Sequence, residues 1–189
     1  LRLMADEGVQ IVCMEVSAHA VTMHRLEGIS YEAACYMNLS QDHLDYFGSM
    51  ERYFDAKKSL FVSGAVRNAA LNADDDYTSR IVKDLHIPHS TFGICTNADI
   101  FARDIEIHES GVDFKLSLWN EMLYTVHLQM MGMFNVYNAL AATATALIVG
   151  IQPEHITRGL SAVKAVPGRA EVLDTNTAFK VILDYSHTP

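Results

Sequence analysis

The chain has 189 residues, half of them hydrophobic, with 14 Lys and Arg against 23 Asp and Glu, which gives a net charge of −9 when His is neutral. This length suits one compact domain, or one domain plus a fragment. The negative charge argues against non-specific binding to nucleic acid or to anionic membranes, which requires a basic surface.

The apolar runs and the cysteines indicate the compartment. The longest apolar runs are shorter than the roughly 20 residues that span a bilayer. Cys13, Cys35 and Cys95 are odd in number and form no CxxC motif, and Cys13 and Cys35 lie in apolar runs. We therefore expect a soluble, cytoplasmic protein with buried free thiols. The chain starts in LRLMADEG without an initiator Met and stops soon after a predicted strand, so we also expect a piece of a longer chain.

The first half of the chain alternates short apolar runs with helical segments. The run VQIVCMEV at 9–16 is apolar and rich in β-branched residues, which is typical of a strand buried on both faces. A helix is expected over 49–61, because Gly48 interrupts the preceding helical run and Ser49 is a good N-cap. This alternation predicts an α/β fold with a mostly parallel sheet flanked by helices. The other elements expected here are strands at 33–39, 68–74 and 87–94 and a helix at 75–85.

The pattern of apolar and polar residues changes in the second half of the chain. Residues 99–130 alternate apolar and polar side chains around turns at 110–111 and 119–121, which predicts an antiparallel meander with one solvated face. Helices are expected at 134–150, ended by a glycine, and at 153–163, where Pro153 suits the first turn. After a linker at 164–168, two strands joined by a polar turn are expected within 165–173 and 179–185.

Polar side chains follow the first two predicted strands. Glu15, Ser17 and His19 come at the end of the run 9–16, and ligands of open α/β sheets lie beyond the carboxyl ends of strands. Glu15 could therefore bind a cation or a substrate, or it could simply emerge into solvent. The loop after the second strand carries Asp42 and His43, and His43 could share one metal ion with Glu15. Alternatively, His43 is structural and Asp42 caps a helical turn.

Lys57 faces the apolar side of the helix predicted over 49–61, whereas the next residue, Lys58, has acidic neighbours at helical spacing. A chain break at Gly48 would fold this helix back and bring Lys57 toward the strand ends and His43. The alternative is a lysine whose stem covers the aromatic rings while its ammonium stays in water. The neighbours of Lys57 at helical spacing are Met50, Tyr53, Phe54, Leu60 and Phe61.

Two further pairs of residues suit nucleotide recognition. Asn135 and Asn138 lie three residues apart near the start of a helix, where their carboxamides could read the edge of adenine or cap the helix. Arg169 follows a Pro-Gly turn and Asp184 ends a strand. An arginine suits a phosphate, and an aspartate suits the hydroxyl pair of a ribose.

Taken in order, these stretches resemble the Mur ligases, the ATP-dependent amide-forming enzymes of peptidoglycan assembly. The resemblance covers nearly the whole chain and is closest to the branch that adds the third amino acid to UDP-N-acetylmuramoyl-L-alanyl-D-glutamate. It is carried by the stretches MEVSAHAVTMHRLEGI, NLSQDHLDYFGSMERYFDAKKSLF, LNADDD, GMFNVYNALAA and VPGRAEVL with DYSHTP.

The resemblance implies a role for each candidate residue. Lys57 would be carbamylated by carbon dioxide and would act in catalysis, because apolar walls disfavour its ammonium and a carbamate offers Mg²⁺ the oxygen ligands that it prefers. The implied cofactors are Mg²⁺ and ATP, and the implied reaction passes through an acyl phosphate that an amino group attacks. The remaining implied roles are Mg²⁺ binding by Glu15 and His43, UDP-muramoyl-dipeptide binding by Ser17, His19 and Arg25, adenine contacts by Asn135 and Asn138, a phosphate contact by Arg169 and a ribose contact by Asp184.

The resemblance also implies the domain organisation. Residues 1–165 would form the central, P-loop-NTPase-like domain, and 166–189 would begin the C-terminal ligase domain. The chain contains no GxxxxGK[ST] phosphate loop, and Met23 stands where the family commonly has a glutamine. We therefore expect this chain to be inactive alone and its full-length parent to be a monomeric ligase without nucleic-acid or membrane partners. The alternatives are a non-catalytic module that binds nucleotides or UDP-sugars, a small metal hydrolase, or a related ligase similar to folylpolyglutamate or cyanophycin synthetases.

Overall fold

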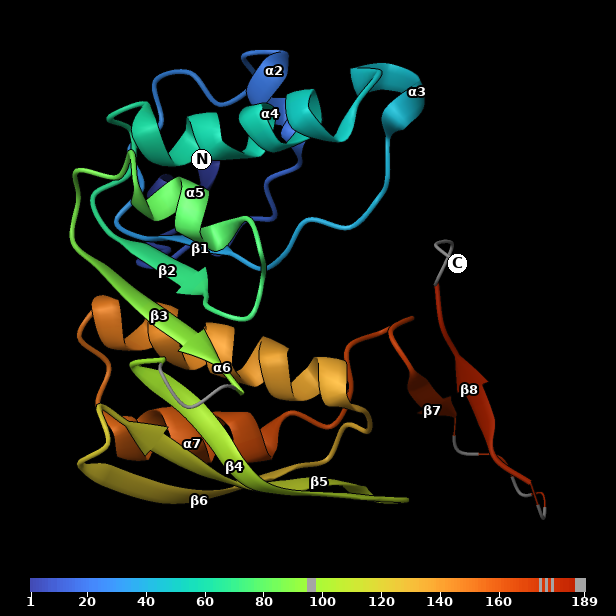
Figure 1. Ribbon diagram of the computed structural model, residues 1–189. Coiled ribbons are helices and arrows are strands. Elements are labelled where there is room, and N and C mark those ends of the chain that lie inside the picture. The colour runs from blue at the N-terminus through green and yellow to red at the C-terminus, as the bar shows by residue number, and fades with distance from the viewer. Residues whose placement is uncertain (95–97, 174, 176, 178, 186–189) are drawn as a thin grey trace.

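The computed structural model describes residues 1–94, 98–173, 175, 177 and 179–185. Six strands form one sheet in which spatial order follows chain order. The first four strands pair in parallel, and the last three form an antiparallel meander (Figure 1). The prediction of a mostly parallel sheet with an antiparallel meander is therefore confirmed. The strands are β1 (Ala34–Tyr36), β2 (Ala69–Asn72), β3 (His89–Gly93), β4 (Ile100–His108), β5 (Gly111–Leu118) and β6 (Met122–Leu128).

Helices cover both faces of this sheet (Figure 1). On one face, α6 contacts the four parallel strands and α7 contacts β6, while α4 and α5 pack over β1 and β2 on the other face. None of the helices in the described ranges combines the length and hydropathy that a bilayer crossing requires. The helices are α1 (Arg2–Asp6), α2 (Ala18–Thr22), α3 (Leu44–Phe47), α4 (Met50–Val62), α5 (Thr78–Val82), α6 (Met133–Ile148) and α7 (Pro153–Ala162).

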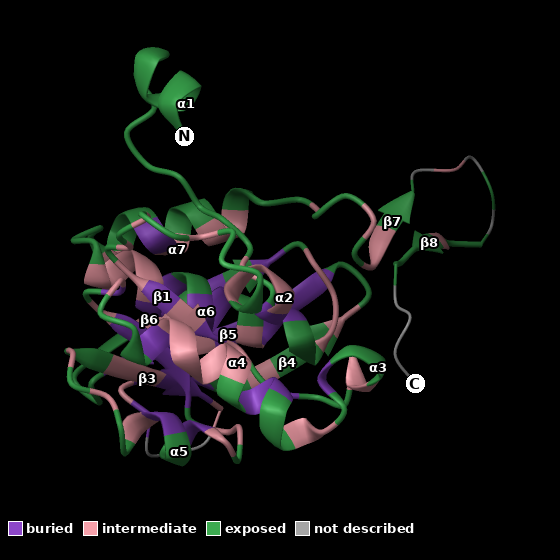
Figure 2. Cartoon of the chain, turned by 90° about the horizontal axis from the view of Figure 1, so that it is seen from above, coloured by how far each residue is buried: buried purple, intermediate pink, exposed green. Residues whose placement is uncertain are grey.

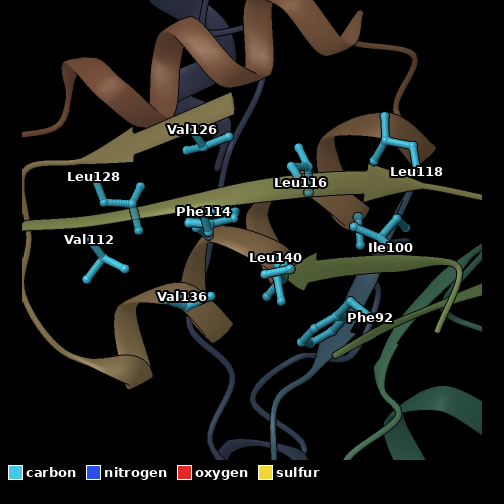
Figure 3. Packing of buried hydrophobic residues seen from close by; sticks show 14 of the residues in the cluster. Phe92, Ile100, Val112, Phe114, Leu116, Leu118, Val126, Leu128, Val136 and Leu140 are labelled. Carbon is cyan, nitrogen blue, oxygen red and sulfur yellow. The ribbon is translucent and has the colours of Figure 1, made fainter. Parts of the chain in front are cut away.

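Strand β2 separates two hydrophobic clusters because successive side chains of a strand point to opposite faces. Ala70 belongs to the cluster that α6 closes, while Ala69 and Leu71 belong to the cluster under α4 and α5. Figure 3 shows the first cluster, in which Leu140 of α6 packs among side chains of β3, β4 and β5. All four residues of β2 are buried, as the apolar run predicts for a strand covered on both faces.

The prediction of a buried strand at 9–16 is wrong. This segment forms no regular secondary structure and pairs with no described strand, and most of its apolar side chains are exposed, Ile11 with an exposed fraction of 67%. Figure 2 shows this segment leading from α1, which stands apart from the body of the molecule. A strand requires a neighbour whose backbone completes its hydrogen bonds, and apolar composition alone does not provide one. Cys13 in this segment is exposed, contrary to expectation, whereas Cys35 is partly buried; Cys95 lies outside the described residues.

The meander carries one irregularity that positions side chains. Arg103 pairs with Lys115 and Glu106 pairs with Asp113, so β4 has one more residue than β5 between these two pairs. This β-bulge contains Asp104, whose backbone has a positive φ of 52°. Across the bulge, the alternation of β4 side chains shifts by one residue, so Arg103 and Glu106 lie on the same face of the sheet.

The C-terminal strands form a separate two-stranded sheet. Strands β7 (Glu171–Leu173) and β8 (Val181–Leu183) pair in antiparallel fashion, as the sequence predicts. They stand beside the main body in Figures 1 and 2. The turn between them includes residues 174, 176 and 178, which lie outside the described residues.

Candidate functional site

The chain reverses direction between α3 and α4, as predicted from Gly48 and Ser49. Gly48 ends α3 with a left-handed backbone, at a φ of 73°. Ser49 then caps α4, because its hydroxyl oxygen accepts a hydrogen bond from the backbone N–H of Arg52 at 3.3 Å. The break allows α4 to return toward the sheet instead of continuing the direction of α3.

Lys57 lies on the side of α4 that faces the end of β1. Its Nζ donates a hydrogen bond of 2.8 Å to the backbone oxygen of Asn38 and lies 5.1 Å from the centre of the Tyr53 ring. Burial lowers the pKa of Lys57, and the nearby carboxylates of Asp75 and Asp42 partly oppose this shift. The side chain is half-buried, and its amine is tied to the backbone just beyond β1.

His43 lies against the same aromatic side chain as Lys57. The ring centres of His43 and Tyr53 are 5.9 Å apart with perpendicular planes, and the His19 ring lies 4.7 Å from that of His43. Asp42 holds His43 in place, since its Oδ1 accepts the backbone N–H of His43 at 2.7 Å and its Oδ2 lies 3.4 Å from Nε2. The structure therefore brings His19, His43 and Lys57 to one region around Tyr53.

Glu15 is not part of this cluster in the structure. It lies in the segment 9–16, which forms neither helix nor strand, and is exposed. Within the described residues, the group of three His, Cys, Asp or Glu side chains that is close enough to hold an ion lies in the meander, so Glu15 does not complete such a group with Asp42 and His43 here.

Asp75 joins the ends of β1 and β2 and was not singled out from the sequence. Its two carboxylate oxygens accept the Tyr36 hydroxyl and the Leu39 backbone N–H, each at 2.9 Å. Burial, reinforced by the Asp75 carboxylate, raises the pKa of Tyr36, so this hydroxyl remains a donor. The three consecutive aspartates 74–76 directly after a buried strand are the sequence signal for this position.

Asp74 links β3 to α6. Its Oδ2 accepts the Tyr137 hydroxyl at 2.8 Å and the Ile94 backbone N–H at 2.6 Å. A Cβ at Gly93 would lie 2.8 Å from the same carboxylate oxygen, so only glycine allows β3 to approach so closely. Two aspartates that follow β2 thus anchor the surrounding elements, Asp75 toward β1 and Asp74 toward α6.

Asn135 and Asn138 share one face at the start of α6, as predicted. Asn135 is buried, donates to the Met131 backbone oxygen at 2.8 Å and accepts from Nδ2 of Asn138 at 3.2 Å. The cap of α6 is Gly132, without a side-chain hydrogen bond, so the capping alternative for these two residues is wrong.

Arg169 and Asp184 come together at one end of the β7–β8 pair. The Asp184 carboxylate accepts the backbone N–H of Ala170 at 2.7 Å, and the Arg169 guanidinium lies 5.8 Å from the centre of the Tyr185 ring. At the other predicted substrate positions, Ser17 caps the short helix α2 by accepting the Ala20 N–H at 3.2 Å, and Arg25 is exposed in the following turn.

A family model and curated relatives both match this chain. The model of the Mur ligase middle domain matches residues 1–146. The chain is 41% identical to the UDP-N-acetylmuramoyl-L-alanyl-D-glutamate–2,6-diaminopimelate ligase of Solibacter usitatus, over 94% of this chain and 36% of that protein. It is also 41% identical to the ligase of the same name from Geobacillus thermodenitrificans, over 98% of this chain and 39% of that protein. The chain therefore spans about two-fifths of the length of these relatives.

Solved structures show the same likeness. A structure of a UDP-N-acetylmuramoyl-L-alanyl-D-glutamate–2,6-diaminopimelate ligase superposes with a TM-score of 0.83 at 29% identity, over 91% of this chain and 36% of that chain. The MurF ligase of Thermotoga maritima in complex with ADP superposes with a TM-score of 0.69 at 19% identity, over 85% of this chain and 36% of that chain. The second likeness concerns the fold alone.

Proposed function

This chain belongs to the Mur ligase family, and from that premise we propose that it is the central part of an ATP-dependent ligase of peptidoglycan synthesis. The proposed reaction adds the third amino acid to UDP-N-acetylmuramoyl-L-alanyl-D-glutamate. The names of its relatives favour 2,6-diaminopimelate as that amino acid. Residues 1–165 would form the central domain and 166–189 the start of the C-terminal domain, in a monomeric cytoplasmic enzyme.

The observation that carries the proposal is the environment of Lys57. Its amine points at the carboxyl end of β1, its pKa is lowered by burial, and it shares the Tyr53 ring with His43. A lowered pKa increases the fraction of neutral amine, which is the nucleophile that attacks carbon dioxide. The new N–C bond gives a carbamate and releases one proton, so a cationic side chain becomes an anionic one.

The side chains of this region suit Mg²⁺ once Lys57 is carbamylated. Mg²⁺ prefers oxygen ligands, and the carbamate of Lys57 would supply them beside the His43 imidazole. We propose Glu15, which lies in the irregular segment 9–16, as the remaining protein ligand. When bound, Mg²⁺ would neutralise the crowded phosphate and carboxylate oxygens.

The remaining residues would hold the two large substrates. Asn135 and Asn138 would contact adenine, Arg169 a phosphate and Asp184 the ribose of ATP. The UDP-muramoyl dipeptide would be held by the residues that follow the segment 9–16, which are Ser17, His19 and Arg25.

The reaction then follows phosphoryl-transfer and acyl-transfer chemistry. The terminal carboxylate of the dipeptide attacks the γ-phosphorus of ATP, which forms an acyl phosphate and releases ADP. The amino group of the incoming amino acid attacks the acyl carbon, a tetrahedral intermediate collapses, and phosphate leaves as the amide forms. Positioning and charge stabilisation by the protein lower the barriers of both steps.

A pair of lysine variants in the full-length ligase tests this proposal. Lys57→Ala should abolish ligation, measured as phosphate release, and small carboxylates such as formate should partly restore it. Lys58→Ala is the matched control, since Lys58 pairs with Asp84 at the surface and should be dispensable. Activity of Lys57→Ala close to that of the unaltered enzyme would refute the catalytic role.

Two measurements address the rest of the proposal. The 189-residue chain alone should show no ATP-dependent ligation, because it lacks a phosphate loop and spans only part of its relatives. A screen of amino-acid acceptors with the full-length ligase should give the highest phosphate release with 2,6-diaminopimelate. Preference for lysine would correct the acceptor and leave the reaction class intact.

A further inference from the structure

The outer face of the meander carries a cluster of two histidines and one aspartate that the proposed ligase reaction does not use. His108 ends β4, Asp113 lies in β5 and His127 lies in β6. Their potential ligand atoms all lie within 4.8 Å of one another. The cluster sits on the β4–β6 half of the sheet, whereas Lys57 reaches the end of β1 at the opposite edge.

The fold builds this cluster through strand register. Asp113 pairs directly with His127 of β6 and with Glu106 of β4, which places His108, two residues further, on the same face as Asp113. The bulge at Asp104 is essential to this arrangement. If β4 continued without the bulge, so that Asp104 paired with Phe114, His108 would lie on the face that carries Val112 and Phe114.

The contacts within the cluster leave ligand atoms available. Nδ1 of His127 lies 2.6 Å from one oxygen of Asp113, and Nε2 of His108 lies 3.0 Å from the other. Nε2 of His108 is shielded from solvent but forms no hydrogen bond, because the contact is not aligned for one. The His127 interaction lowers the pKa of Asp113, so this carboxyl group is ionised. The oxygens and nitrogens of the three side chains thus lie close together, and hydrogen bonds within the cluster do not occupy all of them.

We propose that His108, Asp113 and His127 form a binding site for a divalent transition-metal ion of the Zn²⁺, Ni²⁺ or Co²⁺ class. Two imidazoles and one carboxylate are a donor set typical of such ions, and Mg²⁺ and Ca²⁺ prefer oxygen ligands alone. Three protein ligands leave the fourth position of a tetrahedral ion to water. A bound ion would join β4, β5 and β6 across their solvent-exposed face.

Cobalt binding to the full chain, prepared without a histidine tag, tests the site. Co²⁺ should bind at one equivalent and give the visible absorption of a tetrahedral complex, and Zn²⁺ should abolish this absorption by displacement. An excess of Mg²⁺ in the buffer keeps Co²⁺ from sites that favour oxygen ligands.

Single substitutions assign the ion to these residues. His108→Ala and His127→Ala should each weaken Co²⁺ binding at least about tenfold, as even the loss of a residue that only orients a ligand costs that much. Asp113→Asn should weaken binding as well and keeps the shape of the side chain. Circular dichroism and thermal unfolding of each metal-free variant identify any loss of fold. The Co²⁺ affinities of the variants that remain folded then test the assignment.

Two histidine controls exclude other sites. His155 lies on α7 beside Arg158, so His155→Ala is the matched control that should bind Co²⁺ as the unaltered chain does. His43→Ala reports separately on the Lys57 region, where His43 lies beside His19. Absence of tetrahedral absorption, or equal binding by the His108 and His127 variants, would overturn the proposal. Loss of binding only in His43→Ala would place the ion at the Lys57 region and refute the meander site without touching the proposed ligase function.

Discussion

The amine of Lys57 donates a hydrogen bond of 2.8 Å to the backbone oxygen of Asn38, which ties the middle of α4 to the chain just beyond β1. The two residues are 19 positions apart in the chain, and the reversal at Gly48 and Ser49 brings them together. Burial lowers the pKa of this amine, so in the proposed ligase the nucleophilic nitrogen would lie just beyond the carboxyl end of β1.

Carbamylation of Lys57 should depend on pH in a defined direction. A lowered pKa raises the share of neutral amine at a given pH, and below that pKa each further pH unit increases this share about tenfold. With dissolved carbon dioxide held constant, the carbamate signal in ¹³C NMR with labelled bicarbonate should therefore grow between about pH 7 and pH 8.5. Lys57→Met should remove the signal and Lys58→Met should retain it; the reverse pattern would show that the wrong lysine was chosen.

Two cysteines should differ strongly in reactivity. Burial raises the pKa of Cys35 to about 11, so at about pH 8 only about one thiol in a thousand is ionised, whereas Cys13 is exposed. In a Cys95→Ser background, a disulfide reagent should label Cys13 at least about ten times faster than Cys35. Cys13→Ser should then remove the fast phase. A fast phase that survives this substitution would mean that Cys35 is accessible.

Two glycine-to-alanine changes should alter stability in opposite directions. A Cβ at Gly111, the first residue of β5, would lie 1.8 Å from the backbone oxygen of Leu128. Gly111→Ala should therefore lower the free energy of unfolding by about 1–3 kcal/mol. Gly159 lies within α7 with open space around it, so Gly159→Ala should raise the same quantity by about 0.5–1 kcal/mol. Urea unfolding measures the free energy of unfolding of both variants. The same change in Gly111→Ala as in Gly159→Ala would contradict the close approach at Gly111.

Features that depend on neighbouring residues could be predicted from the sequence. The break at Gly48 and the cap at Ser49 are local, and so are the turns of the meander. The pairing of Asn135 with Asn138 follows from helical spacing alone. In each case the physical cause lies within about one helical turn or one hairpin.

Features that depend on distant partners could not be predicted. The segment 9–16 has the composition of a buried strand, but no described strand pairs with it, and Glu15 is exposed there. The contacts of Asp75 with Tyr36 and Leu39 span 39 and 36 residues, so only the assembled sheet shows them. The cluster of His108, Asp113 and His127 was missed because the bulge at Asp104 decides which face His108 occupies. Histidine and aspartate on either side of the 110–111 turn were the available signal.

The bulge at Asp104 lets the β4–β5 hairpin tolerate the loss of one residue. Deletion of Asp104 would place Ile105 opposite Phe114 and would leave Glu106 opposite Asp113, so the strand pairs beyond this point would stay in register. Ile105 would still pack against the core, and the Glu106 side chain would stay exposed. A chain shortened at this position would thus keep every charge in water and gain a regular ladder.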